Sequence, residues 1–218
     1  FDEEKVTNFE AGLKGTILDD TLRFSLAAFH TQYDDLQVLI LTVQDNGLPG
    51  PQLTTNAGEA QTQGLEAEAQ WALGSYFQLL ATYAYLDTEY TRLESNLEPY
   101  EGNRLRNAPK NSYSLSAIFD HPLGSGSVNA RADYTYKDKA FQDIQNQEEA
   151  AIPSYDLLNL RFAYTFAEQR WEVAAWLKNA LDEEYFLHNS VLNPGLAQLP
   201  VPAAPRTWGL TATLKFGN

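Results

Sequence analysis

The feature that most constrains this chain is a two-residue alternation of apolar and polar side chains, clearest near its C-terminal end. The stretch from Thr207 to Phe216 reads TWGLTATLKF and carries an apolar residue at every second position. A period of two is typical of a β-strand with one apolar face. Aromatic residues bracket this row about eight residues apart, or about 26 Å at the usual strand rise. That length matches the apolar band between the two aromatic girdles of a membrane β-barrel. The row consists of Trp208, Leu210, Ala212, Leu214 and Phe216.

The same alternation recurs along the rest of the sequence. It predicts further strands within residues 8–17, 22–43, 65–71, 77–90, 112–119, 128–137, 156–166 and 171–178. Short turns are expected at 19–20, 74–75, 124–126 and 168–170, and long loops at 44–53, 91–110, 138–154 and 182–206. The last of these loops contains four prolines, which favour an irregular loop over a strand. Short and long connections therefore alternate strictly along the chain.

This alternation of connections is typical of outer-membrane barrels, which have brief periplasmic turns and longer extracellular loops. We therefore predict an all-β fold, an antiparallel up-and-down transmembrane β-barrel of about nine strands, with the C-terminus in the periplasm. No run approaches eighteen consecutive apolar residues, so a transmembrane helix is excluded. The net charge of −14 argues against a nucleic-acid partner, and the lack of cysteine excludes a disulfide framework and a Cys-based metal site.

An odd number of strands needs an explanation. Bacterial single-chain membrane barrels have even numbers of strands, and an open sheet edge in lipid leaves backbone groups unpaired at several kcal/mol each. Either further strands outside this sequence close the sheet, or the count of nine is off by one. The sequence begins at Phe1, contains no methionine and shows no signal segment. We therefore expect a fragment or a processed chain.

Five phrases, in order, resemble the C-terminal barrel portion of TonB-dependent outer-membrane receptors. They are NFEAGLKG at 8–15, NAGEAQTQGLEAEAQW at 56–71, GNRLRNAPKNSYSL at 102–115, WLKNALDEEYF at 176–186 and PRTWGLTATLKF at 205–216. The resemblance implies a barrel of roughly 22 strands with a plugged lumen. Residues 1–218 would form its last nine strands, while the N-terminal plug domain and energy-coupling box of the family are absent from these residues.

By this resemblance, the protein would take up a scarce nutrient across the bacterial outer membrane, with a ferric siderophore as the default ligand. Its partners would be outer-membrane lipid, the plug, the remaining barrel strands, the ferric chelate, and the TonB energy-coupling complex acting through the plug. One alternative is a complete, smaller barrel that acts as a passive pore or a structural protein. Another is a soluble β-sandwich binding module, which would leave the rows of aromatic residues exposed to water.

The sequence offers no catalytic constellation, so we expect neither an enzyme nor a cofactor. His30, His121 and His188 lack the spacing of a metal site. In the long loops, cationic and aromatic residues are candidates to hold an anionic chelate, although such a cluster also serves to offset neighbouring acids. The candidate ligand-binding residues are Tyr100, Arg104, Arg106, Tyr185 and His188. The candidate plug-facing residues of the lumen wall are Glu66, Glu68, Arg131, Asp133 and Lys178.

Overall fold

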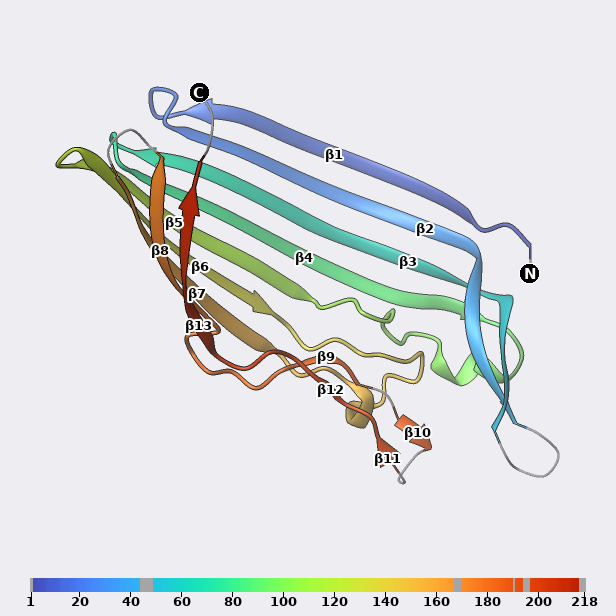
Figure 1. Ribbon diagram of the computed structural model, residues 1–218. Helices are drawn as coiled ribbons and strands as arrows, with labels where there is room; N and C mark the ends of the chain where they lie inside the picture. Colours follow the sequence, from blue (N-terminus) through green and yellow to red (C-terminus); the bar gives the residue numbers. More distant parts are fainter. Residues whose placement is uncertain (1, 44–48, 167–169, 190, 194–196, 216–218) are drawn as a thin grey trace.

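A nine-stranded antiparallel sheet dominates the structure, a computed structural model that describes residues 2–43, 49–166, 170–189, 191–193 and 197–215. Each strand pairs with the next along the chain, in the order β1-β2-β3-β4-β5-β6-β7-β8-β13 (Figure 1). The predicted up-and-down arrangement of nine strands is confirmed. Its strands are β1 (Lys5–Ile17), β2 (Leu22–Val43), β3 (Pro49–Leu73), β4 (Phe77–Leu93), β5 (Asn111–Leu123), β6 (Gly126–Lys137), β7 (Tyr155–Thr165), β8 (Trp171–Lys178) and β13 (Thr207–Leu214).

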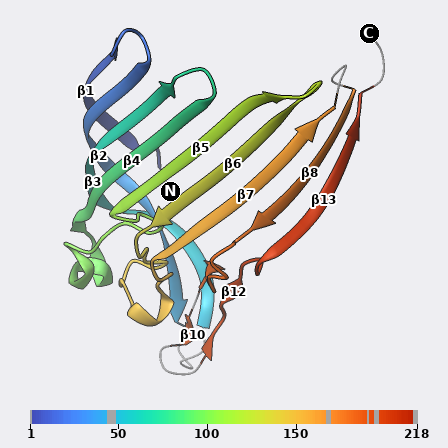
Figure 2. The ribbon, with the colours of Figure 1, turned by 90° about the vertical axis from the view of Figure 1, so that its left-hand side faces the viewer.

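The sheet is curved and open, with β1 and β13 as its two edges (Figure 2). Among the described strands, no second large sheet packs against it, since the two other sheets have two strands each. The soluble sandwich is therefore not supported. A small closed barrel is not supported either, because β1 and β13 are not neighbours. The described strands form part of a barrel wall.

Short turns gather at one end of the sheet and long loops at the other (Figure 1). Tight turns need residues that tolerate a positive φ. Asp19 and Asp20 connect β1 to β2 with φ values of 53° and 64°, and Gly74 and Gly124 serve the next two turns with φ values of 69° and 62°. Strand β13 ends at the short-turn end, where Leu214 pairs with Trp171. The predicted alternation of connections is thus confirmed, although residues 168 and 169 of the fourth turn lie outside the described residues.

The first predicted long loop is wrong in part, because the hairpin of β2 and β3 extends into it. Leu53 pairs with Ile40, and Pro49 pairs with Val43 at the end of the ladder, so residues 49–53 are strand. The aliphatic run at the end of β2 favours extended pairing, and it outweighs the prolines of the partner segment. Residues 44–48 lie outside the described residues. The β2–β3 hairpin therefore projects beyond its neighbours at the long-loop end (Figure 1).

The long loops also contain structure that the sequence did not indicate. The fourth loop was expected to be irregular, but β9 (Phe186–His188) pairs with β12 (Val201–Pro202), and β10 (Val191–Asn193) pairs with β11 (Ala197–Gln198). A proline is tolerated there because a two-stranded ribbon is all edge. The second and third loops contain the short 3₁₀ helices η1 (Ser95–Tyr100) and η2 (Glu148–Ala150). None of the helices in the described residues is long and apolar enough to cross a membrane.

The strand register assembles one apolar face across the sheet. Residues paired across neighbouring strands share a face, and the pairs Leu26–Ala67, Ala67–Tyr83 and Tyr83–Tyr113 continue one apolar row over four strands. Side chains on this face are largely exposed, with 55% of Phe162 and 73% of Leu210 accessible. A continuous exposed apolar surface of this kind fits contact with lipid.

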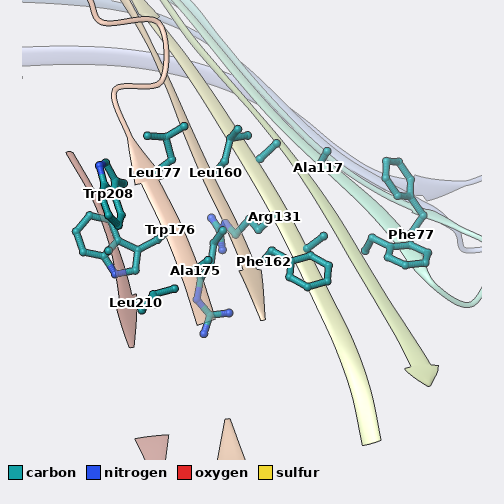
Figure 3. A pocket seen from close by; sticks show the side chains of 15 residues that line it. Phe77, Ala117, Arg131, Leu160, Phe162, Ala175, Trp176, Leu177, Trp208 and Leu210 are labelled. Atoms are coloured by element: carbon teal, nitrogen blue, oxygen red, sulfur yellow. The ribbon is translucent and has the colours of Figure 1, made fainter. Parts of the chain in front are cut away.

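A shallow groove crosses this apolar face over β4 to β8 and β13 (Figure 3). Large side chains such as Phe77, Phe162 and Leu210 border it, and small ones such as Ala117 and Ala175 line it between them. Its apolar lining continues the surface that the register builds. The groove therefore belongs to the apolar face of the wall.

Candidate functional site

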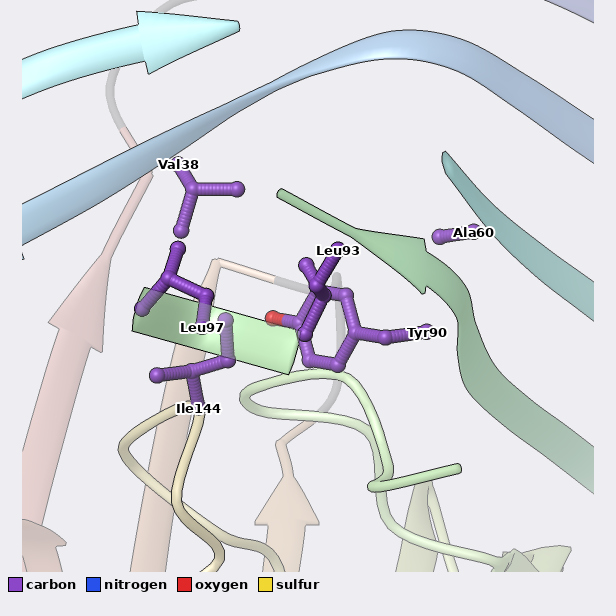
Figure 4. Close-up of a cluster of buried hydrophobic side chains, with 6 residues drawn as sticks. All are labelled: Val38, Ala60, Tyr90, Leu93, Leu97 and Ile144. Carbon is purple, nitrogen blue, oxygen red and sulfur yellow. The ribbon is translucent and has the colours of Figure 1, made fainter. Parts of the chain in front are cut away.

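A small apolar cluster fixes two of the long loops onto β2, β3 and the C-terminal end of β4. Loop 2 denotes residues 94–110, loop 3 residues 138–154 and loop 4 residues 179–206. Leu97 of loop 2 and Ile144 of loop 3 are 4% and 6% exposed, and they pack with strand residues that include Tyr90 (Figure 4). Tyr100 packs against the same cluster. The full cluster is Val38, Ala60, Tyr90, Leu93, Leu97 and Ile144.

Side-chain amides then join loop 2 to loop 3. The Nδ2 atom of Asn103 donates to the carbonyl of Ile144 at 2.9 Å. Asn146 binds both backbone groups of Arg104, because its Oδ1 accepts from the Arg104 amide at 2.8 Å and its Nδ2 donates to the Arg104 carbonyl at 2.9 Å. An amide that satisfies two backbone groups fixes their relative position. Loops 2 and 3 therefore behave as one docked unit.

Gln142 of loop 3 connects all three loops. Its side chain is buried, its Nε2 donates to Asn107 Oδ1 at 2.6 Å, and its Oε1 lies 2.8 Å from Nδ1 of His188 in loop 4. Its main-chain carbonyl accepts from Nε of Arg106 in loop 2 at 2.7 Å. Both Arg106 and His188 are exposed. One buried glutamine thus presents a guanidinium and an imidazole together at the surface of the long loops.

Two further contacts attach loop 4. The buried Asn189 donates from Nδ2 to the carbonyls of Glu149 and Ala151, at 2.8 and 3.3 Å, although its Oδ1 is buried with no partner among the described residues. The ring of Tyr185 stacks on that of Tyr155 in β7, with centroids 4.8 Å apart. Loop 4 is thereby held against loop 3 and the end of β7.

The predicted ligand-binding residues separate into two groups. Arg106 and His188 are brought together at the surface, whereas Tyr100 and Arg104 support the loops from within. The Nη2 of Arg104 donates to the Ala108 carbonyl at 2.5 Å, and its guanidinium carbon lies 5.9 Å from the centre of the Phe141 ring. Its Nε is buried without a partner in the described part of the chain. Tyr185 belongs to neither group, because its half-buried ring stacks on that of Tyr155.

The predicted wall residues all lie on the polar face of the sheet, opposite the apolar rows. Glu66 and Glu68 alternate with Leu65 and Ala67 in β3. Nε of Arg131 donates to both carboxylate oxygens of Asp133 at 2.8 Å. The ammonium of Lys178 lies 5.6 Å from the centre of the Trp176 ring. These contacts give Arg131, Asp133 and Lys178 partners on the polar face.

At the root of loop 3, Asp138 forms an electrostatic junction. Asn111 donates to it from Nδ2 at 2.7 Å, and the hydroxyl of Tyr136 donates to its other oxygen at 2.9 Å. The hydrogen bond from Asn111 is the main cause that lowers the pKa of Asp138 below its ordinary 3.8, with Tyr136 and the nearby Arg104 adding to the effect. Asp138 therefore fastens loop 3 to β5 as a carboxylate.

The described residues contain no group of three histidine, aspartate or glutamate side chains arranged to hold a metal ion. His121 lies between two aromatic rings, at 4.5 Å from Tyr76 and 5.8 Å from Phe119, at the short-turn end. The amides that organise the loops were missed from sequence, and the density of Asn and Gln in residues 142–147 was a signal for only two of them, Gln142 and Asn146. The five are Asn103, Asn107, Gln142, Asn146 and Asn189.

Known proteins resemble this chain in sequence over most of its length. The chain is 31% identical to the metal-pseudopaline receptor CntO of Pseudomonas aeruginosa over 217 residues, which is 99% of this chain and 28% of that receptor. It is 30% identical to the ferrichrome outer membrane transporter/phage receptor of Escherichia coli over 156 residues, 66% of this chain and 20% of that protein. The chain therefore spans less than a third of the length of these relatives.

A solved structure shows the same fold. The ferric yersiniabactin uptake receptor FyuA of Yersinia pestis superposes with a TM-score of 0.81 at 20% identity, over 98% of this chain and 30% of that one. The sequence model described as TonB dependent receptor-like, beta-barrel matches residues 1–180. Barrels of this family are outer-membrane proteins, and its members are transporters and receptors that bind ferric chelates, engage TonB and contain a plug domain. The chain belongs to the TonB-dependent receptor-like β-barrel family.

Proposed function

We propose that this chain is the C-terminal part of the barrel of an outer-membrane receptor for energy-coupled uptake of a metal chelate, with a ferric siderophore as the leading ligand. The observation that carries the proposal is the joint presentation of exposed Arg106 and His188 by loops that are docked on one another. Two relatives are named as the receptor for metal-pseudopaline and the transporter for ferrichrome. Both names support a chelate as the ligand class.

In this proposal the long loops face the cell exterior, and the short turns and the C-terminus face the periplasm. The apolar face contacts lipid. The polar face, with Glu66, Glu68, Arg131, Asp133 and Lys178, faces a plug domain that lies elsewhere in the full protein, together with the strands that close the barrel. Energy reaches the plug from the TonB complex. This chain spans only 28% and 30% of the length of two similar receptors, which supports a plug and further strands elsewhere in the full protein.

Arg106 supplies the electrostatic part of ligand capture. Its Nε is occupied by the Gln142 carbonyl, while the terminal nitrogens have no partner among the described residues. A guanidinium held in this way offers a fork of donors to a carboxylate or another anionic group of the chelate. Tyr100, Arg104 and Tyr185 act on the ligand through the positions of the loops.

Two experiments test this function. An antibody to residues 1–218 should detect, in outer-membrane fractions, a polypeptide several-fold heavier than 24.4 kDa. Deletion of the gene should abolish growth on a ferric siderophore from a panel under iron limitation, and the intact gene should restore growth only in cells with a working TonB complex. A band at about 24.4 kDa, or growth that is indifferent to TonB, would overturn the proposal.

A further inference from the structure

The exposed imidazole of His188 is held in one orientation and one tautomer by a buried partner. Gln142 Nε2 donates to Asn107 Oδ1, so the amide presents its Oε1 to Nδ1 of His188 at 2.8 Å. Because a carbonyl oxygen only accepts, Nδ1 must carry the hydrogen. The neutral ring then has its lone pair on Nε2. Gln142 is only 5% exposed and is hydrogen-bonded at both amide atoms, so its buried side chain fixes the orientation of the His188 ring.

Such a ring is prepared to bind a metal. Metal-ligating histidines donate their other ring N–H to an oxygen acceptor, which sets the tautomer and the direction of the ligating nitrogen. The acceptor for His188 is already in place. The described residues hold no cluster of three potential ligands, however, so this surface does not retain a bare ion. The imidazole is suited to complete the coordination of a metal that a chelator already carries.

The neighbouring Arg106 selects the kind of chelate. Its Nε is bound to the main-chain oxygen of the same glutamine, so the guanidinium and the imidazole stand no further apart than one glutamine and two hydrogen bonds allow. A ligand that spans them has an anionic group for Arg106 and a metal for His188. Polycarboxylate chelators of divalent transition metals combine these two features.

We propose that Arg106 and His188 form a two-point site for a carboxylate-bearing chelate whose metal has an open coordination position, with Nε2 of His188 replacing a water on the metal. This inference rests on the proposed function and narrows its ligand class to chelates, ferric ones included, that leave a coordination position of the metal open for the imidazole. The residues that ligate or pair with the ligand are His188 and Arg106, and Gln142 is the positioning residue.

The test uses the full-length receptor in detergent and copper(II)–iminodiacetate, a dicarboxylate chelate with open positions. Pulsed electron paramagnetic resonance detects the remote nitrogen of an imidazole bound to copper. We expect His188→Gln to remove one imidazole signal, while the matched control His30→Gln, on β2, keeps it. Gln142→Leu should retain the signal but raise the dissociation constant about ten-fold or more, as loss of such a supporting partner does. Arg106→Gln should raise the dissociation constant of the copper chelate about ten-fold, because a charge-assisted contact is lost.

Equal imidazole signals in the wild type and His188→Gln would overturn the inference, as would an Arg106→Gln or Gln142→Leu variant that binds the probe as tightly as the wild type. Each variant is compared at equal yield of the heat-modifiable folded barrel on gels, so that a folding defect is not mistaken for lost binding. TonB-dependent growth on a chelated metal is measured in parallel. Growth without the copper signal rejects this site and keeps the proposed function, whereas the signal without such growth rejects the proposed function.

Discussion

Substitution of Asn146 should open the docked loops without unfolding the wall. Asn146 holds both backbone groups of Arg104, at 2.8 and 2.9 Å, and its own φ of 54° lies in the left-handed region. Each neutral hydrogen bond contributes about 1 kcal/mol net. Alanine costs about 1 kcal/mol more in the left-handed region than glycine or asparagine, which tolerate that conformation. We therefore expect loop docking to weaken by about 3 kcal/mol in Asn146→Ala and by about 2 kcal/mol in Asn146→Gly.

Hydrogen exchange on the full-length receptor measures these two values separately. At about 1.4 kcal/mol per factor of ten, amides in residues 103–107 and 141–146 should exchange about 150-fold faster in the alanine variant and about 30-fold faster in the glycine variant. The exposed neighbour provides the control, since Gln145→Ala should leave exchange unchanged. Equal acceleration of the β5 and β6 amides would refute the claim that loop docking is a separate unit. Equal effects of alanine and glycine would refute the strain contribution.

Three further predictions concern the wall, the junction of loop 3 and the ligand. Gly209→Ala should destabilise the barrel by about 1–3 kcal/mol, measured as a lower Tm, because a Cβ there overlaps the indole of Trp176; Trp176→Ala should make that substitution neutral. Asp138, whose pKa is lowered by Asn111, should stabilise the loop 3 junction above pH 3.8 and lose that effect as pH falls through its lowered pKa; Asp138→Asn should flatten the acid dependence of local exchange. Arg106→Glu should weaken binding of an anionic ferric chelate more than Arg106→Gln does, and titrations at rising salt should narrow that difference because salt screens the repulsion from glutamate.

The strands and their faces were predictable because a period of two is a local property. Arg131 and Asp133 alternate with Ala132 and Tyr134, and no distant contact is needed to decide which pair lies on the apolar face. The connection lengths were equally local, since turn-forming residues mark the short turns. The same local logic failed at residues 49–53, 186–188 and 201–202, where prolines predicted loops. Pro49 lies at the end of the β2–β3 ladder and Pro202 in a two-stranded ribbon, and only the partner strand reveals those positions.

The direction of a side chain in a loop was not predictable. Arg104 and Arg106 are neighbours of the same chemistry, yet one is turned inward to the Ala108 carbonyl and the other outward beside Gln142. The difference depends on loop 3, which comes later in the sequence and reads only as a polar, acidic stretch. Side-chain amides such as that of Gln142 have no periodic signature, because their hydrogen-bond partners, such as Asn107 and His188, lie in distant segments.

The two parts of the molecule are therefore stabilised by different means, and this bears on ligand recognition. The wall depends on a continuous ladder of strand pairs and on cross-strand contacts such as that of Trp176 with Gly209. The loops depend on a six-residue apolar cluster and on a few hydrogen bonds made by the side-chain amides of Gln142 and Asn146. Because few contacts fix the loops, a single amide substitution can move Arg106 or His188 while the ladder stays intact. Substitutions of the buried asparagine and glutamine residues should thus change ligand specificity as readily as substitutions of the residues that touch the chelate.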